Sequence, residues 1–101
     1  DNLMATSANK VYVGDVGTII YVNTKEDISA ATILQLKVKK PSGKEVTWNG
    51  VLDGTMKIKY IVQLNDFDEA GDYYVQAYVE LPAWRGRGET DQFKVFDRFT
   101  K

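Results

Sequence analysis

The sequence contains no cysteine and no histidine among its 101 residues. Without cysteine there is no disulfide, thiolate zinc site or cysteine nucleophile, and without histidine there is no imidazole base. Long apolar runs are also missing, and the N-terminus has no basic-then-apolar signal, so we expect no membrane partner. These absences exclude most of the common enzyme classes, and the sequence predicts a protein with no catalytic residue and no cofactor.

The charged residues are nearly balanced. Thirteen basic and 14 acidic side chains give a net charge of -1, so nothing draws the whole chain to nucleic acid. The hydrophobic fraction of 44% is ordinary for a globular chain, and the length suits one core. We expect residues 1–9, which are polar and aperiodic, to form a flexible arm in which Met4 is a candidate natural start. Residues 10–101 are expected to form a single domain.

Apolar residues recur with a period close to two along most of the chain, which is typical of half-buried strands. Strands are predicted at 10–13, 18–23, 32–40, 45–48, 56–64, 72–81 and 90–99. About seven short antiparallel strands in a chain of this length indicate an all-β sandwich, with a small barrel as the main alternative. The nearest candidate for a helix is a single turn at 65–71.

The stretch "EAGDYYV" at 69–75 resembles the E–F corner of immunoglobulin-like domains. The resemblance places Glu69 at the acidic position, Gly71 in the turn and Tyr73 at the corner tyrosine. It implies an immunoglobulin-like sandwich in which the Tyr73 hydroxyl bonds back to the loop backbone. Val75 stands where that family has its second cysteine, and Trp48 does not occupy the position of the family's core tryptophan. The resemblance is therefore to a disulfide-free relative.

A second resemblance covers residues 11–96. The strings "VYVGDVGTIIYV", "ISAATILQLKVKKPSGKEVTW", "FDEAGDYYVQAYVEL" and "GETDQFKVF" occur in the order found in small tailed-phage virion domains. They resemble the N-terminal domain of the baseplate upper protein family. This implies a structural component of the tail, baseplate or capsid surface, made in the host bacterial cytoplasm, whose partners are other virion proteins or further copies of itself. The alternative is a secreted or cell-surface module that adheres or binds glycans.

An acidic cluster precedes the strand at 72–81, and two interpretations apply to it. Its oxygen-bearing residues are Asn65, Asp66, Asp68, Glu69 and Asp72. Such oxygens are calcium ligands, but the spacing and closing glutamate of a dedicated calcium loop are absent. We expect these residues to cap and shape a turn and to hold no metal.

Two tyrosines are predicted to point outward from the strand at 72–81. Tyr74 and Tyr78 share a face, and Gln35, Lys37 and Lys39 would flank them if their strand is a neighbour. Aromatic side chains on an open sheet face suit a protein interface or a glycan platform. Cross-strand pairing with lysine stems, which stabilises a sheet without any ligand, is the alternative.

The segment 82–88 is predicted to be a loop that carries Trp84, Arg85 and Arg87. Tryptophan and arginine dominate interface hot spots, so these three residues are predicted to bind a partner. Alternatively, Trp84 folds back and caps the open end of the core.

The last strand has aromatic residues on both of its faces. Phe96 lies on the face opposite Phe93 and Val95, which predicts that Phe96 meets a neighbouring subunit.

Overall fold

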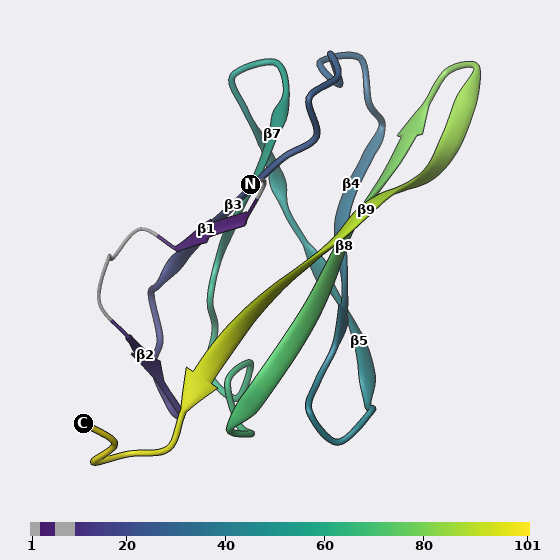
Figure 1. The fold of residues 1–101 in the computed structure, drawn as a ribbon. Helices are drawn as coiled ribbons and strands as arrows, with labels where there is room; N and C mark the ends of the chain where they lie inside the picture. Colours follow the sequence, from purple (N-terminus) through teal and green to yellow (C-terminus); the bar gives the residue numbers. More distant parts are fainter. Residues whose placement is uncertain (1–2, 6–9) are drawn as a thin grey trace.

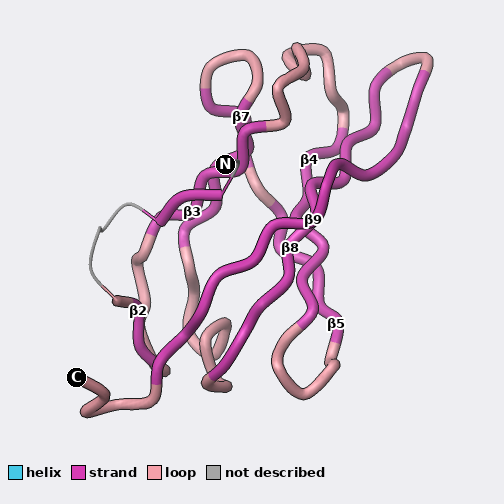
Figure 2. Tube along the Cα trace, in the orientation of Figure 1, coloured by secondary structure: helices cyan, strands magenta, loops and turns pink. Residues whose placement is uncertain are grey.

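The computed structural model describes residues 3–5 and 10–101, and these residues form two β-sheets and no helix (Figures 1 and 2). The first sheet has the order β1-β3-β7-β6, with strands β1 (Leu3–Ala5), β3 (Ile19–Asn23), β7 (Lys57–Ile61) and β6 (Val51–Asp53). The second has the order β2-β9-β8-β4-β5, with strands β2 (Val11–Tyr12), β9 (Trp84–Phe96), β8 (Gly71–Leu81), β4 (Ile33–Lys39) and β5 (Glu45–Asn49). Neighbouring strands are antiparallel except β2 and β9, which are parallel.

The core lies between the two sheets because each strand turns alternate side chains inward. The five-stranded sheet contributes mainly Leu36, Val38, Val75, Ala77, Val79 and Val95, all of them buried. The four-stranded sheet contributes Ile20, Val22 and Ile58, and Val62 follows at the end of β7. This arrangement is an all-β sandwich, as the period-two pattern predicts, and the division into two sheets excludes a closed barrel.

An aromatic cluster joins the two sheets at one end of the core. The Trp48 ring of β5 stacks on the Tyr60 ring of β7, with centroids 4.9 Å apart. Phe67, in the loop before β8, packs against Trp48, Tyr73 and Phe93 at centroid distances of 6.1, 5.7 and 5.6 Å. Large rings bury much apolar surface each, so this cluster is a major part of the attraction between the sheets.

The described residues form nine strands, where the sequence predicts about seven. One addition is β1, which lies inside the predicted flexible arm 1–9 and pairs with β3; residues 1–2 and 6–9 of that arm lie outside the described residues. The other is β6, which the sequence does not predict because it lies between two dipeptides typical of turns, Asn49-Gly50 and Asp53-Gly54. The predicted helical turn at 65–71 is wrong: residues 64–67 form a hydrogen-bonded turn closed by Asp66 N–H and the Gln63 carbonyl at 3.1 Å.

The prediction of a loop at 82–88 is also wrong. Only Pro82 and Ala83 form the turn, and β9 begins at Trp84, so that β8 and β9 make one long hairpin. Gly86 and Gly88 lie in the strand, where the register shifts opposite Gln76 and Tyr78. Glycine in a strand often marks such a bulge, so the two glycines that suggested a loop mark an irregularity in the ladder instead.

Gly50 marks the point where the chain crosses from one sheet to the other, between β5 and β6. Its N–H donates to the Leu34 carbonyl at 3.0 Å in the five-stranded sheet. A Cβ at this position would lie 2.4 Å from Ile58 Cγ2 and 3.0 Å from the Lys59 carbonyl oxygen. The close approach of the backbone to β7 therefore requires a residue without a side chain.

We predict that Gly50→Ala lowers the free energy of unfolding by about 1–3 kcal/mol, because the added methyl overlaps a buried isoleucine and a backbone oxygen. Denaturant unfolding measures the difference. Gly88→Ala is the matched control: its Cβ would lie 3.9 Å from the Ala77 Cβ, an ordinary contact, so its stability should equal or slightly exceed that of the wild type. Equal losses in the two variants would show that the crossing does not depend on Gly50.

Candidate functional site

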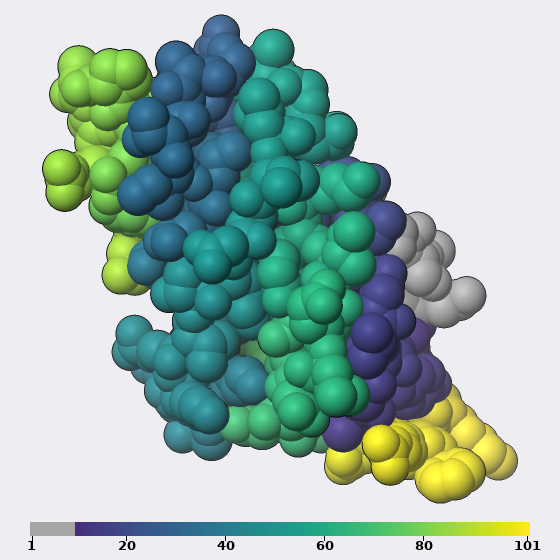
Figure 3. Space-filling view, turned by 180° about the vertical axis from the view of Figure 1, so that it is seen from behind, coloured from purple at the N-terminus to yellow at the C-terminus, as the bar shows by residue number. Residues whose placement is uncertain are grey.

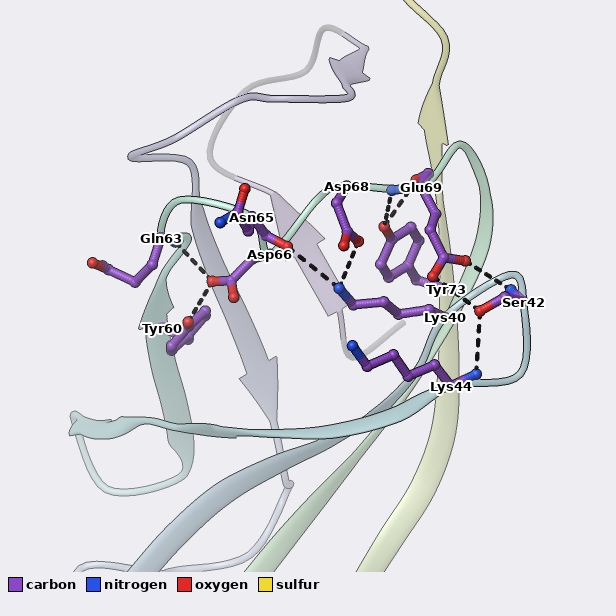
Figure 4. A network of polar contacts seen from close by, with 10 residues as sticks. All are labelled: Lys40, Ser42, Lys44, Tyr60, Gln63, Asn65, Asp66, Asp68, Glu69 and Tyr73. Carbon is purple, nitrogen blue, oxygen red and sulfur yellow. Dashed lines mark hydrogen bonds and ion pairs between the residues drawn. The ribbon is translucent and has the colours of Figure 1, made fainter.

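The corner before β8 is fixed by Tyr73 (Figure 4). Its hydroxyl donates to the Glu69 carbonyl at 2.8 Å and accepts from the Glu69 N–H at 3.2 Å. The ring is fully buried, and burial raises the pKa of the hydroxyl to about 12. Gly71 has φ +124°, and a Cβ there would lie 3.0 Å from the Pro41 side chain. The geometry is that of a backbone corner locked by one tyrosine.

The acidic residues of this corner bind separate partners in the chain (Figure 4). Asp66 accepts hydrogen bonds from the Tyr60 hydroxyl and, at 2.7 Å, from the Gln63 N–H. Asp68 forms an ion pair with Lys40 at 2.6 Å. The Glu69 carboxylate accepts from the N–H and the hydroxyl of Ser42, at 2.8 and 2.9 Å. Together with the Lys40–Asp68 ion pair, these bonds join loop 63–69 to turn 40–44.

These contacts explain the local electrostatics. The Lys40 ammonium, bonded to Asp68, lowers the pKa of that carboxyl. Burial, and then the hydrogen bond to Asp66, raises the pKa of the Tyr60 hydroxyl. In the part of the chain that the structure describes, no three acidic side chains are grouped so that they could hold a metal ion. Asp66, Asp68 and Glu69 stabilise the closed end of the sandwich, and each of these three carboxylates has a different partner.

Lys40 belongs to this network, and sequence reasoning missed it. Only 4% of the residue is exposed, although a lysine beside a turn in a lysine-rich segment ordinarily faces solvent. Its Nζ also donates to the Asn65 carbonyl at 3.3 Å. The sequence contains a sign of this burial. Lys40 follows the inward-facing Leu36 and Val38 at the same two-residue spacing, so its side chain is also directed inward. An inward lysine at the end of a strand requires a partner across the core.

The outer face of the five-stranded sheet brings together one group of the predicted binding residues. Strand β4 lies beside β8, since Gln35 pairs with Tyr78, Lys37 with Gln76, and Lys39 with Tyr74. The condition under which these residues flank the two tyrosines is therefore met. The Lys37 Nζ lies 5.0 Å from the centre of the Tyr78 ring, and the Tyr78 hydroxyl donates to Glu80.

A shallow hollow of about 770 Å³ lies over this face. Its lining comes from four adjacent strands, β5, β4, β8 and β9. The side chains that face outward along these strands and line it are Lys37, Lys39, Glu45, Thr47, Tyr74, Gln76, Arg87 and Thr90. We call this set the outer-face hollow.

The structure separates Trp84 from Arg85 and Arg87. Because β9 is a strand, the two arginines share the outer face with Tyr78 and Glu80, their partners in the ladder. Trp84 points to the other side, together with its partner Leu81. The three residues predicted to bind as one loop cluster therefore contribute to two surfaces.

The Trp84 side chain is 54% exposed, so it does not cap the core. Its ring lies against Gly86, where a Cβ would be 2.5 Å from a ring atom. Ile28, Val79 and Leu81 join Trp84 around a hollow of about 330 Å³ between the hairpin and the β3–β4 loop. We call this group the hairpin groove.

The aromatic ring of Phe96 already contacts other residues of the same chain. Its ring packs against Tyr12 of β2 at a centroid distance of 6.3 Å. The ammonium groups of Lys10 and Lys94 lie 4.7 and 5.9 Å from its centre. Such cation–π contacts cover the ring, so Phe96 is a weaker candidate for a subunit contact than its position in the sequence indicates.

Comparison of the chain with protein-family models, characterised proteins and solved structures found no match. Over the described ranges, 3–5 and 10–101, there is no helix with the length and apolar character needed to cross a bilayer.

One inward carboxylate is poorly accommodated. Asp91 lies on the core side of β9, opposite Val75, and its Oδ2 is buried without a hydrogen-bond donor among the described residues. Burial raises the pKa of this carboxyl; neighbouring Glu89 acts in the same direction and Lys25 in the opposite one. Glu26 also lines the adjacent hollow. The charged form of Asp91 is therefore disfavoured in the folded state.

We predict that Tyr73→Phe lowers the free energy of unfolding by about 1–2 kcal/mol, because the Glu69 carbonyl loses its buried donor while the ring is kept. Tyr74→Phe is the control, since Tyr74 is exposed on the neighbouring position and should change stability by less than about 0.5 kcal/mol. Chemical denaturation compares them. A Tyr73→Phe variant as stable as the wild type would contradict the role of the corner.

We predict that Asp91→Asn raises the melting temperature at pH 7. The pKa of Asp91 is higher in the folded protein than its ordinary value of 3.8. The wild type therefore loses folding stability as the pH rises from 3.8 through the pKa of Asp91 in the folded state. The advantage of the variant should therefore shrink as pH falls through that window. Thermal melts from pH 3.5 to 7, with the exposed Asp97→Asn as control, measure it. An advantage that does not change with pH would refute the assignment to the Asp91 charge.

Proposed function

We propose that this chain is a non-enzymatic, immunoglobulin-like interaction domain of a tailed-phage virion, located in the tail, the baseplate or the capsid surface. The resemblance over residues 11–96 supports the virion assignment. Its partners are neighbouring virion proteins or further copies of this chain, and its site of action is the virion after synthesis in the host cytoplasm. The domain acts through surfaces held on a rigid sandwich.

Strand order and corner chemistry support the immunoglobulin-like topology. The order β1-β3-β7-β6 corresponds to an A-B-E-D sheet, and β9-β8-β4-β5 corresponds to G-F-C-C′. In this correspondence Tyr73 stands at the start of strand F, and its hydroxyl bonds back to the loop before it, as the resemblance implies. Val75, buried two residues later, packs in the core in place of a disulfide.

The observation that supports an interaction role best is Trp84 in the hairpin groove. A tryptophan that is half exposed beside apolar walls leaves a large part of its ring in contact with water. In an interface the same ring would fill a pocket and act as a hot spot. The groove therefore fits an apolar side chain of a partner protein.

The position of the hairpin also suits docking. Strand β4 stops pairing with β8 at Glu80, so the tip from Leu81 to Trp84 extends past the neighbouring strand. Figure 3 shows this green hairpin projecting from the blue and teal body of the molecule. The molecule is elongated, 46 × 25 × 23 Å, and a projecting tip can reach a partner without strain elsewhere in the sandwich.

We predict that Trp84→Ala weakens assembly, either self-association or binding to a virion partner, by at least about tenfold, as expected for loss of a hot spot. Its melting temperature should stay close to that of the wild type, because the ring is outside the core. Analytical ultracentrifugation over a range of concentrations, and capture of proteins from disrupted virions, measure the assembly.

Leu64→Ala is the matched control, since Leu64 is 75% exposed in the loop after β7, away from the hairpin. It should assemble as the wild type does. A wild-type protein that stays monomeric at high concentration and captures no virion protein would overturn the docking role. Flanking genes that encode no capsid or tail proteins would overturn the virion assignment separately.

The alternative function is a glycan-binding or adhesive module, in which Tyr74, Tyr78 and Trp84 would stack on sugar rings. It is supported by the outer-face hollow, where Tyr74 is exposed among polar side chains.

A further inference from the structure

We propose that the outer-face hollow binds an acidic polysaccharide, a chain of sugars that carry carboxylate groups. This site is independent of the docking role proposed for Trp84, which points to the other side of β9. It is built from Lys37, Lys39, Tyr74, Gln76 and Arg87, on three adjacent strands.

Among the described residues, the cations of this site form no ion pair within 4 Å, although Glu45 lies opposite Lys39 in the β4–β5 ladder. Lys37 Nζ donates to the Thr47 hydroxyl at 3.2 Å, and an Arg87 Nη donates to the Gln76 side-chain oxygen at 3.2 Å, so their hydrogen-bond partners are neutral. Among the described residues the ion pair within 4 Å is that of Lys40 and Asp68, at the corner and not on this face. Three cations and the single carboxylate of Glu45 line the hollow, which favours an anionic ligand.

The spacing of the cations suits a repeating ligand. Lys37 and Lys39 lie two residues apart on β4, about 7 Å along the strand, and both point outward. Arg87 lies across β8, at the level of Tyr78. Charges separated by several ångströms in two directions match carboxylates on successive sugars better than a single small anion, which would reach only one of them.

The remaining groups are those that recognise sugar hydroxyls and sugar rings. Tyr74 is 40% exposed and offers an aromatic face for stacking. The side-chain amide of Gln76 is already oriented, because its nitrogen donates to the Gly88 carbonyl at 3.3 Å while its oxygen accepts from Arg87. A similar pair next to the hollow, the Gln35 amide donating to the Asn49 side-chain oxygen at 3.1 Å, extends the polar surface.

An acidic protein surface would fit this hollow less well. Protein interfaces depend on a desolvated core with apolar or aromatic anchors. Here the outward side chains at the centre are Lys37, Gln76 and Thr90, which form one row across the sheet. Polar rows with an aromatic residue at one side suit a hydrated, hydroxyl-rich polymer.

The test is a calorimetric titration of the full chain with three probes of matched length: oligogalacturonate, a neutral malto-oligosaccharide and poly-glutamate. We expect oligogalacturonate to bind, with an affinity that falls as salt concentration rises. The double variant Lys37→Gln/Lys39→Gln should weaken it by at least about tenfold, as expected for losing a charge-assisted hydrogen bond. Tyr74→Ala should weaken it as well, with little change in the salt dependence.

Lys57→Gln/Lys59→Gln is the matched control, because it removes the same charge from the outer side of β7 in the other sheet. It should bind as the wild type does. Equal binding of poly-glutamate would overturn the proposal in favour of general attraction for anions, and equal binding of the neutral oligosaccharide would overturn the acidic specificity. Absence of oligogalacturonate binding would refute the site while leaving the Trp84 docking role intact.

Discussion

The hydrogen bond from the buried Tyr73 hydroxyl to the Glu69 carbonyl determines where β8 begins and which way its side chains face. Strand β8 lies at the centre of the five-stranded sheet, between β9 and β4, so its register fixes both neighbours. The salt bridge of Asp68 with Lys40 and the carboxylate of Glu69 on Ser42 attach the same corner to the β4–β5 turn. One end of the sandwich is thereby closed by polar contacts around an aromatic cluster.

The side chains of strand β8 face the core on one side and the surface proposed to bind a ligand on the other. Inward, Val75, Ala77 and Val79 pack in the core. Outward, Tyr74 and Gln76 belong to a hollow lined by cations from β4 and β9. Because successive residues of a strand face opposite ways, the corner that orients the core residues orients the outer face at the same time. A one-residue slip would bury the polar set and expose the apolar one.

Much of the fold could be predicted from the sequence, because period-two alternation reports burial directly: the predicted strands at 18–23, 32–40 and 72–81 are β3, β4 and most of β8. The corner role of Tyr73 followed from the resemblance of residues 69–75 to the E–F corner of immunoglobulin-like domains. The hairpin was not predictable, since Gly86 and Gly88 look like a loop unless the bulge is known. For the same reason, the sequence did not predict that Trp84 and Arg85 face opposite sides of β9. The ion pair of Lys40 depends on a contact between distant segments, which local patterns do not report.

A rigid corner at one end of β8 supports an exposed hairpin at the other. Amide hydrogen exchange of the free protein, followed by NMR along β8, tests it most directly. We expect the slowest exchange from Tyr74 to Gln76, where β4 and β9 pair on both sides, and much faster exchange from Leu81 to Trp84, beyond the last β4 pair. Uniform protection along β8, or faster exchange at the corner than at the hairpin tip, would contradict it.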